Sequence, residues 1–178
     1  QRAHHIVCGE QMAAPDRNEF RQTVGLLPTG VTVVSAFQSS GPAGATASAV
    51  CSLSLEPMMM LVCLDLESRS LEAVREAGRF GISVLGEGQR EAAEIFATKS
   101  EQEEKWATVR WREHLGVPII EGGPAHVVCE VAEVIPGGDH VIVTGEVLEV
   151  EAEDDPAEPL IYHGGLFRRL DAGTGDQD

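Results

Sequence analysis

Two long runs of β-type residues separated by a short turn limit the fold more than any other feature of the sequence. Residues 127–135 and 140–150 are rich in Val and Ile, and Pro136-Gly137-Gly138-Asp139 lies between them. Gly, Asp and Pro favour the tight turns that join antiparallel strands. The two runs therefore predict a long hairpin, and with it a mainly antiparallel β fold.

The remaining predicted strands are also joined mostly by turns. They are expected at residues 31–36, 45–51, 58–65, 80–85, 160–162 and 166–170, with residues 38–44 as one of the turns. Regular β-α-β crossovers are missing from this order, so the pattern favours an antiparallel barrel with helices packed outside it. No Gly-x-Gly-x-x-Gly follows a strand, which argues against a Rossmann domain.

Four helices are expected around these strands. The first follows Asp16, which forms a capping-box pattern with Glu19. The second begins after Ser68 or Ser70 and ends at Gly78. The third covers residues 89–97, and the fourth covers residues 101–107 with Ser100 and Glu103 as its capping pair.

Length and charge restrict the organisation and the partners. At 178 residues the chain fits one domain, expected at residues 15–170, with 1–14 as a flexible lead-in and 171–178 as a disordered tail. The longest apolar run, Met58–Leu64, is strand-sized, and the N-terminus has no signal-peptide profile, so no membrane segment is expected. A net charge of −16 with no basic cluster argues against nucleic acid.

The four cysteines are widely spaced, at positions 8, 51, 63 and 129. They form no Cys-x-x-Cys motif, and no paired histidines stand at metal-ligand intervals, so no metal site is expected. Three of them lie in predicted strands, where a reduced, buried thiol behaves as a small hydrophobe. Cys51 is the candidate for a reactive thiol. Reduced thiols indicate a reducing compartment, so a cytoplasmic location is expected.

A second informative segment runs from Gly44 to Pro57 and combines tiny residues with hydroxyl side chains inside a predicted strand. A strand that only fills a core would favour bulky β-branched residues. Small residues instead let a flat ligand approach the backbone, whose N–H groups then become available as donors. The alternative is a tight turn lined by Ser and Thr.

In its order of motifs the chain resembles the flavin-reductase-like family, small NAD(P)H:flavin oxidoreductases that partner two-component monooxygenases. The resemblance covers residues 20–170, although Ala49 stands where a second Ser is common and Met58 where another Pro is common. It rests on five blocks, namely residues 27–34, 44–57, 78–85, 138–147 and 159–165.

The resemblance implies an FMN-binding split barrel, normally a homodimer, with the flavin at or near the subunit interface. It also implies that FMN or FAD is reduced by NADH or NADPH and is then handed to a separate oxygenase. Hydride transfer between two cofactors needs stacked rings rather than a protein nucleophile, so no catalytic side chain is expected.

Carried onto this sequence, the resemblance gives a set of site residues. The flavin would contact Thr29, Thr46, Ala47, Ser48, Cys51, Ser52, Ser54, Asp65, Ser68, Ser70, Phe80 and Phe96. Residues 46–48 would face the ring system, and 52 and 54 the ribityl-phosphate side. Ser68 and Ser70 would bind phosphate or simply cap a helix. Phe80 and Phe96 would touch the flavin or pack in the core.

His140 and Arg168 are the candidates for binding the nicotinamide nucleotide. The alternative for His140 is a solvated turn residue, and for Arg168 a solvated side chain. Two other functions stay open at this point. One is a split-barrel flavoprotein that keeps its flavin and acts on another substrate. The other is a non-enzymatic flavin- or haem-binding protein, although no His or Cys stands in a clear axial position for haem.

Overall fold

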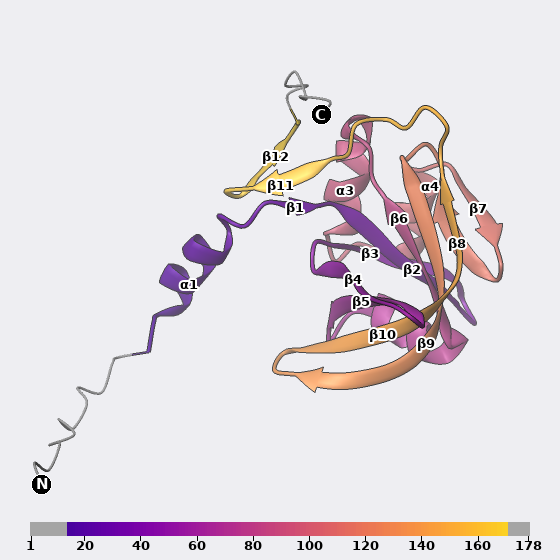
Figure 1. Ribbon diagram of the computed structural model, residues 1–178, viewed down its shortest axis with the longest axis horizontal. Coiled ribbons are helices and arrows are strands. Elements are labelled where there is room, and N and C mark those ends of the chain that lie inside the picture. The colour runs from indigo at the N-terminus through magenta and orange to yellow at the C-terminus, as the bar shows by residue number, and fades with distance from the viewer. Residues whose placement is uncertain (1–13, 171–178) are drawn as a thin grey trace, which may run out of the picture.

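The computed structural model describes residues 14–170 and consists mainly of antiparallel strands with four short α-helices around them (Figure 1). The expected lead-in and tail lie outside the described residues, except for position 14. The helices are α1 (Arg17–Val24), α2 (Arg69–Ala77), α3 (Arg90–Phe96) and α4 (Gln102–Ala107), with a 3₁₀ turn, η1 (Glu87–Gln89), before α3. The strands are β1 (Thr29–Gly30), β2 (Thr32–Gln38), β3 (Gly41–Ala47), β4 (Val50–Leu55), β5 (Met58–Asp65), β6 (Arg79–Val84), β7 (Trp111–His114), β8 (Val117–Ile120), β9 (Ala125–Gly137), β10 (His140–Ala152), β11 (Ile161–His163) and β12 (Leu166–Arg168).

Seven of the strands form one antiparallel sheet in the order β3-β2-β6-β9-β10-β5-β4. β3 and β4 are therefore its two edges, yet only Ser48 and Ala49 separate them along the chain. The sheet must roll up to bring its edges this close. The edges form no ladder with each other, and the backbone N–H of Cys63 donates to the Ala49 carbonyl at 2.9 Å beside the gap. The predicted antiparallel split barrel is confirmed.

The hairpin that the sequence predicted is formed by β9 and β10, each 13 residues long. Both strands extend two residues beyond the predicted limits at their ends away from the turn, and β9 also extends two residues into the predicted turn. Gly138 has a φ of +79° in that turn, a backbone conformation that favours glycine. In Figure 1 the hairpin is the longest feature of the molecule, and it runs beyond the body of the barrel at its turn.

Three local predictions were wrong. Residues 41–44 belong to β3 rather than to a turn, because Gly41–Gly44 pairs in register with Ser35–Gln38 of β2. The predicted strand at 45–51 is two strands, since the chain leaves one sheet edge at Ser48 and enters the other at Val50. The Ser100/Glu103 pair does not cap α4, whose N-cap is Glu101 with no side-chain cap.

The hairpin formed by β7 and β8 was missed altogether, because its strands are only four residues long and one contains Pro118. By contrast, the capping predictions at two other helices are confirmed. Asp16 accepts hydrogen bonds from the N–H groups of Asn18 and Glu19, and Ser68 caps α2. Gly78 ends α2 in the left-handed conformation, with a φ of +66°.

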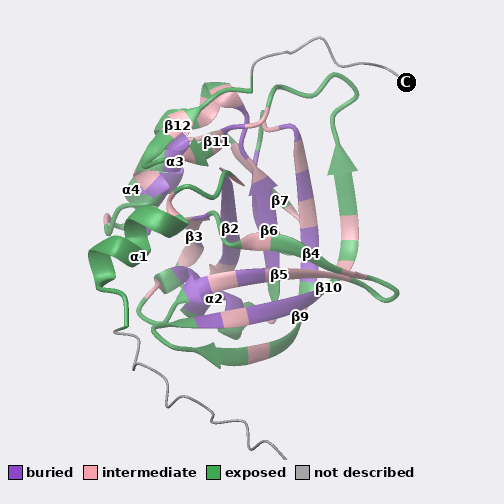
Figure 2. Ribbon diagram, turned by 60° about the vertical axis from the view of Figure 1, so that its left-hand side comes forward, coloured by how far each residue is buried: buried purple, intermediate pink, exposed green. Residues whose placement is uncertain are grey.

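β2 is buried over most of its length (Figure 2), and the core lies on both of its faces because alternate residues of a strand point to opposite sides. Val34 and Ala36 join the cluster that contains Leu71 and Val74 of α2. Val31 and Val33 join a second cluster with α3 and α4. The helices α2 and α3–α4 are thereby fixed relative to the sheet edge β3 between them. Within residues 14–170, no helix has the length and apolar character needed to cross a bilayer.

The described cysteines are all unpaired, but they differ in exposure. Cys129 is completely buried, which raises the pKa of its thiol to about 12, as expected for a structural thiol. Burial, together with Cys51, also raises the pKa of Cys63. Cys51 is exposed, so burial was the wrong expectation for it. Cys8 lies outside the described residues.

Candidate functional site

Two adjoining pockets lie along the edge strand β3. The first, here called the helix pocket, has a volume of about 440 Å³ and lies between β3, the start of α2 and the α3–α4 segment. The second, the strand pocket, has a volume of about 480 Å³ and lies between β3, α3 and β11–β12. Thr46 and Ala97 line both, so the two pockets meet at the middle of β3.

The lining residues divide by element. The helix pocket is lined by Gly44, Ala45, Thr46, Asp65, Glu67, Ser68, Arg69, Ser70, Phe96, Ala97, Thr98, Lys99, Ser100, Gln102 and Lys105. The strand pocket is lined by Val31, Thr46, Ser48, Arg90, Ala93, Glu94, Ala97, Tyr162, Gly165, Leu166 and Phe167.

The wall formed by β3 offers main-chain groups, because this strand pairs only with β2. The N–H of Gly44 points away from β2 and donates to the Gln102 side-chain oxygen at 2.9 Å. By the two-residue repeat of a strand, the N–H of Thr46 points to the same side. A Cβ at Gly44 would lie 3.0 Å from both Phe96 and Trp106, so only glycine lets the strand and the α3–α4 segment approach so closely.

The side chain of Thr46 has a structural role that the sequence did not indicate. Its hydroxyl donates to the carbonyl of Ala93 in α3 at 2.7 Å. This bond holds the helix against the strand between the two pockets. The hydroxyl is therefore engaged within the protein, and Thr46 presents its backbone to a ligand.

The N-terminus of α2 faces the helix pocket. Ser68 accepts a hydrogen bond from the N–H of Leu71, and the Ser70 hydroxyl donates to Ser68 at 3.2 Å. The N–H groups of Arg69 and Ser70, in the first turn, have no partner within a helix, and the helix dipole adds partial positive charge there. Such a helix start is suited to an anion such as a phosphate. Ser68 thus caps the helix while lining the pocket.

A bidentate ion pair joins α2 to α4 beside this pocket. The Arg69 guanidinium binds both carboxylate oxygens of Glu101, one of them at 2.8 Å. The hydrogen bonds from Arg69 and its positive charge lower the pKa of Glu101, and the same hydrogen bonds and the negative charge of Glu101 raise the pKa of Arg69. Both side chains are exposed, so the pair adds little stability, but it fixes the distance between the two helix starts.

Lys105 supplies the second cation of the helix pocket and is only 3% exposed. Its ammonium donates to the carbonyl of Thr98 at 2.7 Å and lies 3.4 Å from that of Phe96. Burial, with a smaller effect of Arg69, lowers the pKa of Lys105. The side chain thus fixes the segment between α3 and α4. It also places a positive charge in the wall of the helix pocket, although the protein as a whole is acidic.

The structure brings together about half of the predicted flavin residues. Those that line a pocket are Thr46, Ser48, Asp65, Ser68, Ser70 and Phe96. Phe96 also belongs to the core, where its ring packs edge-on against Trp106. Thr29 lines neither pocket, but it pairs in register with Tyr162, which does.

The other predicted flavin residues lie elsewhere in this chain. Ala47 is buried, and its carbonyl accepts a hydrogen bond from Thr32. Phe80 is fully buried against Gly145, whose missing side chain leaves room for its ring, so it has the core position that the sequence left open. Cys51, Ser52 and Ser54 lie on β4, the opposite edge of the sheet, and line neither pocket.

The two predicted nicotinamide residues line neither pocket. His140 begins β10 and pairs in register with Asp65, which lines the helix pocket. Its ring nitrogen Nδ1 lies 2.8 Å from the Asp139 carboxylate, and this contact lowers the pKa of Asp139. His140 is therefore at the rim of the helix pocket with its side chain half-exposed. Arg168 is exposed on β12.

Several lining residues were not predicted from the sequence. They are Arg69, Arg90, Lys99, Gln102, Lys105, Tyr162 and Phe167. Arg69 could have been found, since it stands between the two serines that were selected. Gln102 and Lys105 carried no such signal, because a polar residue on a short helix normally faces solvent. Arg90 lies 5.5 Å from the centre of the Phe167 ring, across the strand pocket.

Comparison with known sequences gives a consistent result. Residues 24–171 match the model of the family described as "Flavin reductase like domain". The chain is 38% identical over 158 residues to the reductase subunit HsaB of a flavin-dependent monooxygenase from Mycobacterium tuberculosis, covering 88% of this chain and 83% of that one. It is also 38% identical over 167 residues to an NADH-dependent FAD reductase from Streptomyces globisporus, covering 90% of each.

Solved structures agree with the sequence comparison. An NADH:FAD oxidoreductase from Streptomyces globisporus, in complex with NAD and FAD fragments, superposes with a TM-score of 0.83 at 36% identity, covering 92% of this chain and 96% of that one. The nitrilotriacetate monooxygenase component B from Mycobacterium thermoresistibile superposes with a TM-score of 0.84 at 32% identity, covering 91% and 92%.

Proposed function

This chain belongs to the flavin reductase like domain family, and from that premise we propose that it transfers a hydride from NADH or NADPH to FMN or FAD at the two pockets along β3. The observation that carries the proposal is the meeting of the pockets at Thr46. The helix pocket has the positive charge suited to a phosphate. The strand pocket has aromatic side chains on β11 and β12 that are suited to a flat ring. A molecule with both parts, such as a flavin nucleotide, would span them.

The protein's part in this reaction is binding and orientation, because the flavin and the nicotinamide supply the redox chemistry when they are bound. The α2 N-terminus, Arg69 and Lys105 would hold the phosphate. The backbone of β3 at Thr46 would hold the polar edge of the flavin ring. This contact would fix the plane of the ring and leave its other face open. A second ring that stacks there comes within the ~3–3.5 Å that transfer requires.

His140 would bind the nicotinamide nucleotide from the rim of the helix pocket. Its neighbour in the sheet, Asp65, lines that pocket, so the imidazole is about one strand spacing from the site. Half-exposure leaves the ring accessible to a phosphate or carboxamide oxygen.

We further propose that the reduced flavin passes to a separate oxygenase, as the names of the relatives suggest for those proteins. The three described cysteines are unpaired, which supports a reducing, cytoplasmic setting for both components.

The first prediction is that purified protein oxidises NADH or NADPH in air only when a flavin is added. Rates are measured by the loss of nicotinamide absorbance, with both nucleotides tested against riboflavin, FMN and FAD. Saturation with added flavin is expected, together with loss of flavin during gel filtration. A flavin that stays bound, with no reduction of added flavin, would instead favour a flavoprotein that acts on another substrate. Absence of flavin-dependent oxidation in folded protein would refute the proposal.

The proposed functional unit is a homodimer, for which α1 gives the main support. This helix has no buried residue: its apolar residues Phe20 and Val24 are 58% and 39% exposed, and Leu27, just beyond its end, is 65% exposed. Phe20 and Val24 form an apolar stripe on one face of the helix. Figure 1 shows α1 standing apart from the barrel. On the sheet edge β4 and at the start of β5, Leu53, Leu55 and Met58 are exposed as well. A second copy of the chain would cover these surfaces.

The second prediction follows from this stripe. Light scattering should give twice the 19.0 kDa mass of the chain, and Phe20→Asp should shift the protein toward monomer because it places a charge in the proposed interface. Gln22→Asp, which introduces the same charge on the opposite face of the same helix, is the control and should leave the dimer intact. A wild-type monomer that binds flavin with full affinity would refute the dimer.

A further inference from the structure

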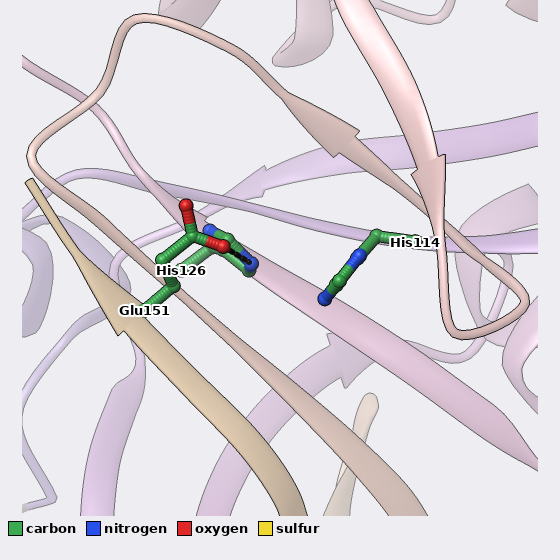
Figure 3. Close-up of side chains that lie close together, drawn as sticks. All are labelled: His114, His126 and Glu151. Atoms are coloured by element: carbon green, nitrogen blue, oxygen red, sulfur yellow. Dashed lines mark ion pairs between the residues drawn. The ribbon is translucent and has the colours of Figure 1, made fainter.

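Two histidines and two glutamates meet on three strands away from both pockets. Figure 3 shows three of them, His114 on β7, His126 on β9 and Glu151 on β10, and the fourth is Glu149, also on β10. One potential ligand atom from each of His114, His126 and Glu151 lies within 4.8 Å of the other two. His126 Nε2 and Glu151 Oε2 are 3.6 Å apart, and His114 Nε2 contacts Glu149 Oε2.

Sheet register explains why these residues gather. His126 pairs directly with Glu151 across the β9–β10 ladder. Val128 pairs with Glu149 two residues further on, so Glu149 and Glu151 share a face of the sheet. The β7–β8 hairpin packs over this face through a small cluster of Val117, Ile119 and Val128. That contact brings His114 to the two glutamates.

His126 has a buried ring nitrogen for which the protein supplies no hydrogen-bond partner. It is 6% exposed, and its Nε2 has no hydrogen-bond partner among residues 14–170. Buried polar atoms are normally satisfied, and an unsatisfied one costs free energy. The orphaned nitrogen points to the Glu151 carboxylate in Figure 3.

We propose that His114, His126 and Glu151 bind a divalent transition-metal ion of the zinc type, with Glu149 beside them as a further carboxylate. Two imidazoles and a carboxylate form a ligand set that zinc uses, with metal–ligand bonds of about 2.0–2.2 Å. Tetrahedral bonds of that length place neighbouring ligand atoms about 3.3–3.5 Å apart, close to the 3.6 Å between His126 and Glu151. His114, with a partly exposed ring, can close the remaining distance.

A plain ion-pair network does not account for the arrangement. Arg112 lies 3.0 Å from Glu151 Oε2, so it competes for one carboxylate oxygen. The carboxylate has a second oxygen with which to keep that contact while it binds a metal. Arg112 also leaves His126 Nε2 without a hydrogen-bond partner, whereas a metal ion would bind this nitrogen. Two nitrogen ligands disfavour Mg²⁺ and Ca²⁺, which prefer oxygen.

The spacing of these residues in the sequence gives no sign of a metal site, which is why none was predicted. His114 and His126 are 12 positions apart, and Glu151 follows 25 positions later. This is no known ligand motif, because the ligands come from strands that meet only in the folded protein. The metal would fasten the β7–β8 hairpin to the long hairpin β9–β10. None of the four residues lines the helix or strand pocket, so the inference does not depend on the proposed function.

The test is zinc-dependent stability of the full-length protein after treatment with a chelator. Zn²⁺ at 100 times its dissociation constant should raise the melting temperature by about 5–10 °C for a domain of this size. Mg²⁺ should cause no rise. Co²⁺ should give the visible absorption of a four-coordinate site, and Zn²⁺ should remove it.

Matched variants locate the site. Glu151→Gln and His114→Gln should each weaken zinc binding at least ten-fold, measured by calorimetry, since each removes one ligand. Glu130→Gln is the control, because Glu130 also lies in the long hairpin and pairs with an arginine, Arg79, but is outside the cluster. Three results would overturn the proposal: no zinc-dependent rise, equal rises in the cluster variants and wild type, or loss of the rise in Glu130→Gln alone.

Discussion

Lys105→Met is expected to weaken the binding of FMN and FAD about 10- to 100-fold while the KM for NADH changes little. The buried ammonium of Lys105 donates to the carbonyl of Thr98 and approaches that of Phe96. The substitution removes those bonds and one positive charge from the wall of the helix pocket. The loss of one hydrogen bond to a charged group costs about 1.5–3 kcal/mol, which corresponds to this range. Fluorescence titration of each flavin measures the effect.

Lys99→Met is the matched control for that experiment. Lys99 lines the same pocket and carries the same charge, but its side chain is exposed. Its removal should change flavin affinity by no more than about two-fold, as is usual for surface substitutions. Equal losses in both variants would mean that only net charge matters. Unchanged flavin binding in a folded Lys105→Met protein would exclude Lys105 from the site.

His140→Ala is expected to lower kcat/KM for NADH or NADPH about 10- to 100-fold and to leave flavin affinity nearly unchanged. The expectation rests on the place of His140 at the rim of the helix pocket, beside Asp65. One hydrogen bond to a charged nucleotide group is again worth about 1.5–3 kcal/mol. Steady-state kinetics with the nucleotide varied at saturating flavin measures it.

His163→Ala serves as the control, because His163 pairs in the sheet with Leu166 on β12 and not with a residue of the helix pocket. It should stay within about two-fold of wild type. If His140→Ala has equally unchanged kinetics, then His140 is a solvated turn residue. The flavin assignment would then still stand. Together, the Lys105 and His140 variants separate the flavin contacts from the nucleotide contacts.

Sequence patterns predicted the barrel because its strands and turns leave local signals. The β9–β10 hairpin has both a Gly-rich turn and two long β-branched runs, and the structure confirms it. Asp16 and Ser68 likewise cap helices through bonds to residues two or three positions away. The β7–β8 hairpin has no comparable signal, since its short strands are held by packing on β9.

The site was only partly predictable for a related reason. Ser68 and Ser70 were found because a helix start is visible in the sequence, and Phe96 because aromatic residues draw attention. Lys105 was missed because nothing near it in the sequence shows that its ammonium is buried under α3. The residues of β4, Cys51, Ser52 and Ser54, were expected at the flavin because of the family resemblance. The chain crosses to the other sheet edge at Ser48 and Ala49, so these residues lie away from both pockets of this chain, and their contact with the flavin stays a prediction.

The main-chain wall of β3 bears on how such a protein can be redesigned. Every residue type except proline carries the same N–H and C=O, so substitutions along β3 leave what this wall recognises nearly unaltered, provided that Gly44 and Thr46 are kept and no proline is introduced. The opposite walls, from residues 96–105 and from β11–β12, present side chains that set the size and charge of the two pockets. Mutant libraries intended to change the choice between FMN and FAD should therefore vary those two segments and preserve β3. Flavin preference could then change while the binding of the flavin ring by the β3 backbone stays the same.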